Sequence, residues 1–163
     1  MGRWRPPQPK ASPYITAAGY ETLQAELKGL WVKRREVVKA LAAAAAEGDR
    51  SENAEYIYRK KELAGIDRRI RYLQKRLPDL TVVQGERNPD QIFFGAWVTL
   101  EEEDGSEREY RIVGADEADP GQQTISMDSP LARALMKKRL DDEIEMVIQE
   151  QRHRYLVTGI RYH

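Results

Sequence analysis

Cysteine is absent from the 163 residues of this sequence, which excludes a disulfide framework and thiol chemistry. Long apolar runs are absent too. The longest is the seven residues from Ala40 to Ala46, whereas a membrane-spanning helix needs about 20. The N-terminal residues MGRWRPPQPK lack the apolar segment of a signal peptide. We therefore expect a cytoplasmic protein with no membrane partner.

The motifs of a self-contained active site are also missing. There is no glycine-rich phosphate loop, no nucleophile paired with a base, and no metal-ligand spacing around the two histidines, His153 and His163. The sequence therefore does not predict an enzyme that is active alone.

The net charge of the whole chain is zero, because it has 27 basic (Lys and Arg) and 27 acidic (Asp and Glu) residues, but the two halves of the chain are oppositely charged. Residues 1–78 contain 17 basic and 9 acidic residues, a net charge of +8, whereas residues 79–163 contain 10 and 18, a net charge of −8. This asymmetry indicates a nucleic acid or an acidic protein surface as partner of the basic half. A solvated charged helix is the alternative that composition leaves open.

A helical hairpin is predicted for residues 16–78, after a flexible basic arm at residues 1–15. Apolar residues recur at spacings of three and four on both sides of Gly48, as in two packed heptad helices. Helices of roughly 30 residues would form a finger about 45 Å long. The first row, which Arg34 interrupts, is Tyr20, Leu23, Leu27, Leu30, Val37, Leu41 and Ala44. The second row, which includes the charged residue Arg59, is Tyr56, Arg59, Leu63, Ile66, Ile70, Leu73 and Leu77.

Residues 79–163 predict a small α+β domain, an antiparallel sheet packed on one helix. Asp104-Gly105 between two alternating runs predicts a β-hairpin. Ser129 and Pro130 predict the N-cap and first residue of a helix that runs through LARALMKKRL. Further strands are expected at residues 81–83, 143–148 and 155–160.

Asp49 and Glu52 lie at the predicted tip of the hairpin, where Gly48 ends the first helix and Ser51 opens the second. D-x-x-E before a helix is a capping box, and spacing alone favours that interpretation. The alternative is a pair of carboxylate ligands for Mg²⁺, which takes six oxygens and usually keeps several waters. Two exposed carboxylates cannot hold the ion tightly, so the alternative requires another molecule to supply further ligands.

The predicted second helix carries a stripe of basic residues after the tip, and the only acidic residues within that stretch are Glu62 and Asp67. Arginine makes bidentate contacts to phosphates, so the stripe fits a polyanion, although a solvated helix flank remains the alternative. Tyr56 and Tyr58 could stack on a base or pack against the partner helix. The stripe consists of Arg59, Lys60, Lys61, Arg68, Arg69, Arg71, Lys75 and Arg76.

These residues resemble a known family. EGDRSENAEYIYRKKELAGIDRRIRYLQK is similar to the tip and second helix of the bacterial Gre transcript-cleavage factors, most closely the GreB branch. FFGAWVTLEEEDG, YRIVGADE and ISMDSPLARALMKKRL look like the C-terminal domain of that family. The resemblance covers roughly residues 16–163. Two departures are Glu55, where GreB-type tips often have Asp, and the long arm at residues 1–15.

The resemblance implies a monomer with a coiled-coil finger and an FKBP-like domain at 79–163 that docks at the rim of the secondary channel of RNA polymerase. It implies that Asp49 and Glu52 at the finger tip help to hold the second Mg²⁺ of the polymerase and to orient a water. The polymerase then hydrolyses the 3′ end of backtracked RNA, which the basic stripe holds. Tip support is expected from Ser51, Asn53, Glu55 and Tyr56.

Two other functions remain possible from the sequence. One is a channel-binding regulator that docks on the polymerase without donating metal ligands, against which the presence of both Asp49 and Glu52 argues. The other is a free-standing RNA-binding coiled coil, whose whole function is the basic stripe.

Overall fold

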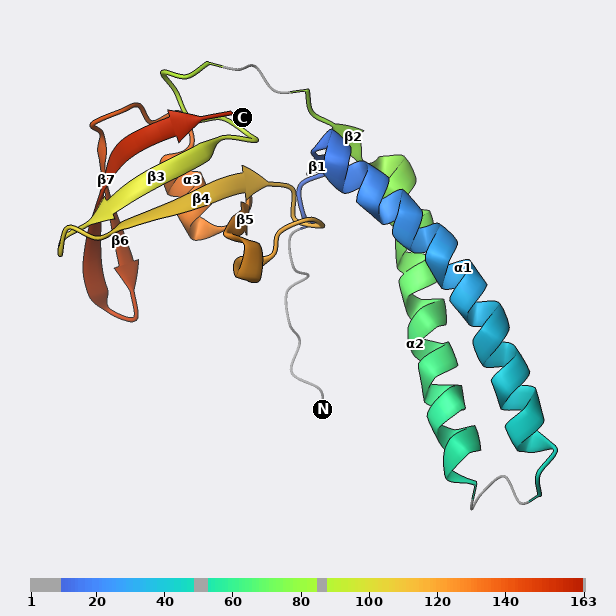
Figure 1. The fold of residues 1–163 in the computed structure, drawn as a ribbon. Helices are drawn as coiled ribbons and strands as arrows, with labels where there is room; N and C mark the ends of the chain where they lie inside the picture. Colours follow the sequence, from blue (N-terminus) through green and yellow to red (C-terminus); the bar gives the residue numbers. More distant parts are fainter. Residues whose placement is uncertain (1–9, 49–52, 85–87, 163) are drawn as a thin grey trace, which may run out of the picture. The chain divides into compact units, whose positions relative to one another are not determined.

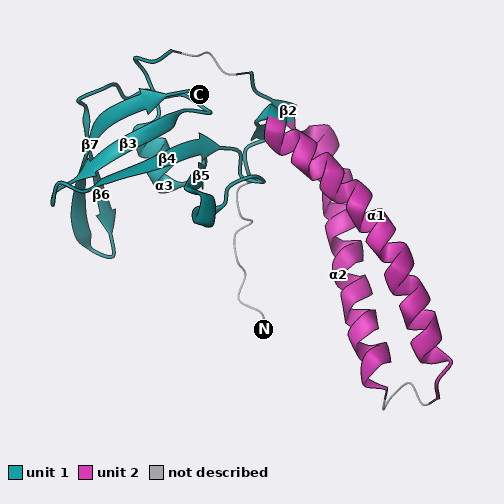
Figure 2. Ribbon diagram, in the orientation of Figure 1, with its two compact units in different colours: residues 1–17, 81–163 teal, residues 18–80 magenta. Residues whose placement is uncertain are grey.

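The structure, a computed structural model, describes residues 10–48, 53–84 and 88–162. The chain divides into two compact units, a hairpin unit of Ala18–Leu80 and a C-terminal unit of Met1–Ala17 with Thr81–His163 (Figure 2). The boundaries expected from the sequence are residues 16–78 and 79–163. The N-terminal residues instead group with the C-terminal unit, which is built from two separate parts of the chain.

The hairpin unit is two long antiparallel helices, α1 (Ala17–Ala45) and α2 (Ala54–Arg76), followed by the 3-10 turn η1 (Leu77–Asp79) (Figure 1). The predicted seam of apolar residues is confirmed, because Val37, Ile66 and Ile70 form a buried cluster between the helices. Each fully buried side chain of this kind contributes about 1.5–3 kcal/mol. Other buried residues of the seam are Leu23, Ala44, Leu73 and Leu77.

Arg34, the polar interruption of the seam, has a partner on the other helix. Its Nε donates to Asp67 Oδ1 at 2.7 Å, and both side chains stay about one third exposed. A pair this exposed contributes little stability, about 0–1 kcal/mol. It lets the charged residue lie at the edge of the seam without an unpaired charge.

The C-terminal unit contains a five-stranded sheet in the order β5-β4-β3-β7-β6. The Asp104-Gly105 hairpin is confirmed, with Gly105 at a φ of 83° and its amide donating to Glu102 O at 2.9 Å. The strands are β3 (Trp97–Glu102), β4 (Glu107–Val113), β5 (Thr124–Ser126), β6 (Glu143–Ile148) and β7 (Gln151–Arg161).

One helix, α3 (Pro130–Leu135), supplies Ala132 and Leu135 to the core of this unit. Its predicted start is confirmed, because Ser129 is the N-cap and its side chain accepts from the Ala132 amide. The predicted extension through Leu140 is wrong. Lys137 has a φ of 69° and donates its amide to Ile92 O at 2.7 Å, so long-range pairing replaces the last helical turns.

Two further predictions need correction. The sheet is mixed rather than antiparallel, because β5 pairs in parallel with β4 after a connection that contains the 3-10 turn η2 (Pro120–Gln122). The expected strand at 81–83 is β2 (Thr81–Val82), which pairs in parallel with β1 (Tyr14–Ile15) outside the main sheet. Because Ile15 is fully buried, the last residues of the predicted arm are ordered strand, while residues 1–9 lie outside the described residues.

No helix in the described part of the chain is long and apolar enough to cross a membrane.

Candidate functional site: the hairpin tip and the basic face of α2

The hairpin tip begins where the helical hydrogen-bond pattern of α1 ends. The amide of Ala46 still reaches Ala42 O and Ala43 O, both at 3.2 Å, and the amide of Glu47 reaches Ala44 O at 3.3 Å. Gly48 then has a φ of 125°, a conformation that only glycine adopts readily. Gly48 therefore ends this side of the hairpin, as the sequence predicted.

Asn53 connects the two helix ends. Its side-chain oxygen accepts from the Tyr56 amide at 3.1 Å, which makes Asn53 the N-cap of α2. Its side-chain amide donates to Ala44 O at 2.7 Å, in the last turn of α1. One side chain thus satisfies a backbone donor of one helix and a backbone acceptor of the other. The predicted opening of the second helix at Ser51 is corrected to Asn53.

The carboxylate pair itself, Asp49 and Glu52, lies outside the described residues, together with Ser51. Of the predicted supporting residues, Glu55 lies in the first turn of α2, where a negative charge is favourable to the helix dipole. Tyr56 is half-buried. Because Asn53 already caps α2, a capping box is not needed to explain how this helix begins.

Seven of the eight residues of the basic stripe separate into two groups in the structure, and the eighth, Arg76, is half-buried at the end of α2. Five of its cations are exposed: Lys60, Lys61, Arg68, Arg71 and Lys75. At 3.6 residues per turn these five fall within an arc of about 100° on the side of α2 opposite the buried seam. The other α2 residues in that arc are Ile57 and Ala64, so no carboxylate of α2 lies among the five cations. We call these five residues the basic face.

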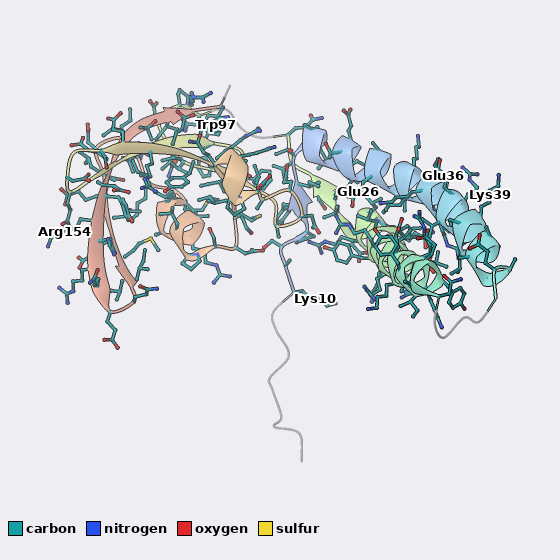
Figure 3. All side chains as sticks on the ribbon, turned by 60° about the horizontal axis from the view of Figure 1, so that its bottom comes forward. Lys10, Glu26, Glu36, Lys39, Trp97 and Arg154 are labelled. Carbon is teal, nitrogen blue, oxygen red and sulfur yellow. The ribbon has the colours of Figure 1, made fainter. Side chains whose placement is uncertain are left out.

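Arg59 and Arg69 are held by carboxylates instead. Arg59 contacts Glu55 at 2.9 Å and Glu62 at 3.2 Å, and its hydrogen bond to Glu55 raises the pKa of the guanidinium. Arg69 forms a two-bond contact with Glu26 of α1, at 2.7 and 3.0 Å; Glu26 is labelled in Figure 3. These two arginines already have anionic partners among the described residues of the hairpin, whereas no ion pair of the basic face is seen among those residues.

Two exposed tyrosines accompany these arginines. Tyr58 is 61% exposed and Tyr72 is 43% exposed. The guanidinium of Arg59 lies 5.6 Å from the centre of the Tyr58 ring, and that of Arg69 lies 5.3 Å from the centre of the Tyr72 ring. The packing alternative for Tyr58 is thus wrong, since a residue packed against the partner helix would not be 61% exposed. Tyr72, which the sequence did not single out, shares this arrangement.

Within residues 10–48, 53–84 and 88–162, no group of three or more His, Asp or Glu side chains could hold a metal ion.

Comparison with known proteins identifies what this chain is similar to. Residues 13–82 match the family described as transcription elongation factor, N-terminal, and residues 86–162 match the family described as transcription elongation factor, GreA/GreB, C-term. The chain is 56% identical over 165 residues to transcription elongation factor GreB of Xanthomonas axonopodis pv. citri, and 53% identical over 165 residues to GreB of Pseudomonas aeruginosa. Each alignment covers 99% of this chain and 98% of the relative.

Among solved structures, GreA factor homolog 1 of Thermus thermophilus is similar with a TM-score of 0.42 and 25% sequence identity. That alignment covers 91% of this chain and 97% of the homolog.

Proposed function

Because the chain belongs to the GreA/GreB family of transcription elongation factors, we propose that it stimulates RNA polymerase to cleave the 3′ end of backtracked RNA through two carboxylates at its hairpin tip. The observation that carries the proposal is where Asp49 and Glu52 fall in the chain. They lie in the connection between Ala45, the last residue of α1, and Ala54, the first residue of α2. A long hairpin that ends in a carboxylate pair suits a site that must reach into another protein.

The donor set fits Mg²⁺ in its chemistry, because carboxylate oxygens are the ligands this ion prefers and one or two protein carboxylates are a usual contribution. Asp49 and Glu52 would hold the ion, and RNA polymerase would supply the remaining ligands. When bound, the ion supplies charge stabilisation and an activated water for phosphodiester hydrolysis. The chain alone, with too few ligands for a tight site, would not cleave RNA.

The N-cap role of Asn53 supports this assignment. The side chain of Asn53 accepts from the Tyr56 amide, so Asn53 fills the N-cap position of α2. Neither Asp49 nor Glu52 is needed at that position, which leaves a role other than capping for them. Their loss would then cost little helix stability.

The basic face of α2 would hold the RNA. Its five exposed cations carry no neighbouring carboxylate on α2 within their arc, and like charges this close repel within a Debye length of about 8–10 Å. A phosphate backbone would neutralise them. Arg59 and Arg69 would contribute less, because binding RNA would require them to exchange the carboxylates of Glu55, Glu62 and Glu26 for phosphates.

The proposal is tested in a stalled, backtracked elongation complex of a bacterial RNA polymerase, with RNA cleavage followed over time. We expect Asp49→Ala and Glu52→Ala to reduce the cleavage rate by orders of magnitude while still competing with the unaltered protein for polymerase. Added Mg²⁺ or Mn²⁺ should partly restore cleavage. Glu47→Ala is the matched control, because Glu47 is another exposed carboxylate beside the tip, and it should cleave at a normal rate.

The same experiment separates the alternatives. If the acidic pair only capped a helix, its loss would cost about 0.5–2 kcal/mol of stability and leave cleavage near normal. Competition for polymerase without any stimulation of cleavage by the unaltered protein would indicate a channel-binding regulator. RNA binding of equal strength with and without polymerase, again without cleavage, would indicate a free-standing RNA-binding coiled coil. Cleavage by the protein without polymerase would overturn the idea that it donates ligands to a partner.

A further inference from the structure

Two carboxylates hold the N-terminal segment of the chain by the same arrangement of bonds. Thr16 donates its amide to Glu117 Oε2 at 2.8 Å and its hydroxyl to Glu117 Oε1. Ser12 donates its amide to Asp128 Oδ2 at 2.8 Å and its hydroxyl to Asp128 Oδ1. In each case both oxygens of one carboxylate bind both donors of one residue. We call these four residues the N-terminal clamp; all belong to the C-terminal unit.

The two carboxylates come from one edge of the main sheet. Glu117 follows β4 and Asp128 follows β5, and these two strands pair in parallel with Val113 opposite Ser126. Because the ends of parallel strands meet at the same edge, both carboxylates reach the same incoming segment. Hydrogen bonds to a charged acceptor are about twice as strong as neutral ones, so four of them hold this segment firmly.

Gly114 shows how closely the segment is held. Its amide also donates to Glu117 Oε2, at 3.0 Å. A Cβ at this position would lie 2.0 Å from the backbone oxygen of Tyr14, a distance at which one backbone must move. The turn after β4 and the strand β1 are therefore in direct backbone contact, with no room for a side chain.

One chain connection of the hairpin leaves directly from the segment that the clamp holds, and the other enters a strand paired with that segment. Helix α1 begins at Ala17, directly after Thr16, and the chain leaves η1 at Asp79 to enter β2 at Thr81. β1 and β2 are joined by bonds from the Thr81 amide to Pro13 O at 2.7 Å and from the Val83 amide to Ile15 O at 2.9 Å. The clamp thus holds β1 and, through β1, the strand β2, where the chain enters and leaves the hairpin.

We propose that Glu117 and Asp128 are positioning residues for transcript cleavage: by clamping Ser12 and Thr16, they hold the base of the finger still so that its tip is placed reproducibly. The inference rests on the function proposed above. Catalysis is sensitive to such placement, since an error of about 1 Å in a reacting group can cost roughly 100-fold in rate. Neither carboxylate touches RNA or metal in this role.

The first test is kinetic, in the backtracked elongation complex. We expect the double variant Glu117→Ala with Asp128→Ala to lower the maximal cleavage rate by about 10- to 100-fold. The concentration of protein that gives half-maximal stimulation should change little. Glu117→Gln keeps one acceptor oxygen and should fall between the unaltered protein and Glu117→Ala. Asp119→Ala is the matched control, because the Asp119 carboxylate accepts from the Gly121 amide instead, and it should leave cleavage unchanged.

The second test measures positioning directly in the free protein. Because the chain has no cysteine, Glu47→Cys and Ser106→Cys would carry two spin labels, one on each unit at an exposed site. We expect the distribution of distances between the labels to broaden when the clamp is removed and to stay the same in Asp119→Ala. Thr16→Val, which removes the hydroxyl and keeps the amide, should broaden it less and keeps the test valid if the double variant does not fold.

An unchanged distance distribution in the clamp variants would overturn the inference. So would a broadened distribution with a normal cleavage rate, since positioning would then not matter to the reaction. If the unaltered protein failed to stimulate cleavage at all, the proposed function would fall, and the label distances would still show whether the clamp holds the finger.

Discussion

Replacing Asn53 should destabilise the last turn of α1 and the first turn of α2, and the choice of substitution should decide whether one or both turns are affected. In Asn53→Ala both side-chain bonds are removed, the one accepted from the Tyr56 amide at 3.1 Å and the one donated to Ala44 O at 2.7 Å. The N-cap contributes about 0.5–2 kcal/mol and an ordinary hydrogen bond about 0.5–1.5 kcal/mol. The tip should therefore lose roughly 1–3 kcal/mol of local stability, while the seam around Ile66 and Ile70 is unaffected.

Asn53→Asp separates the two bonds. Aspartate caps a helix about as well as asparagine, and its charge is favourable at a helix N-terminus, but it cannot donate to the carbonyl of Ala44. We therefore expect α2 to keep its first turn in this variant, while the last turn of α1 frays. In Asn53→Ala both turns should fray.

Amide hydrogen exchange followed by NMR measures this difference residue by residue. The amide of Tyr56 reports on the start of α2 and that of Ala46 on the end of α1. Each decrease of about 1.4 kcal/mol in local stability should speed exchange about tenfold where opening is local. If Ala46 exchanges at the same rate in Asn53→Asp as in the unaltered protein, the bond to Ala44 does not hold the tip together and the reasoning is wrong.

Two further predictions concern the basic face and the close approach of Gly114 to Tyr14. Replacing Lys60, Arg68 and Arg71 by alanine should make RNA binding less sensitive to salt. The slope of log binding constant against log salt concentration, measured with single-stranded RNA, should fall by about 0.7 for each phosphate that the protein no longer neutralises. Arg59→Ala and Arg69→Ala should change this slope less, because these arginines already pair with carboxylates, and equal effects in both groups would contradict the division of the stripe. Gly114→Ala should destabilise the C-terminal unit by about 1–3 kcal/mol through overpacking against Tyr14, measured by thermal melting. Gly29→Ala is the control, because no atom lies within 4 Å of its added Cβ, and it should instead stabilise α1 by up to about 1 kcal/mol. Similar melting temperatures for the two variants would count against the close approach at Gly114.

The hairpin could be predicted from the sequence because its determinants are local. Residues three and four apart share a helix face, so the apolar rows alone indicate two helices and the side on which they pack. The same holds for the Asp104-Gly105 turn and for Ser129-Pro130, where a few neighbouring residues suffice. In each case the residues that decide the structure are within one or two turns of each other in the chain.

Features that depend on distant residues could not be predicted in this way. Strand β1 has only two residues and follows a stretch rich in proline, with two arginines and one lysine, so nothing local distinguishes it from a mobile arm. Its stabilising partners Glu117 and Asp128 are 101 and 116 residues away from Thr16 and Ser12. Serine and asparagine are both good N-caps, and the second bond of Asn53 goes to the carbonyl of Ala44, nine residues away on the other helix.

The discontinuity of the C-terminal unit affects the order in which the protein can fold during synthesis. Domains generally fold as units, the N-terminal ones first, yet residues 10–17 leave the ribosome long before β4 and β5, whose following turns bind them. The hairpin is one continuous stretch of chain, so it can fold before the turns that bind residues 10–17 have been synthesised. A fragment that starts at residue 79 would lack β1 (Tyr14–Ile15), so the backbone groups of β2 that pair with β1 would be left open as an unpaired strand edge. We therefore expect residues 79–163 expressed alone to aggregate, and an added peptide of residues 10–17 to improve their solubility.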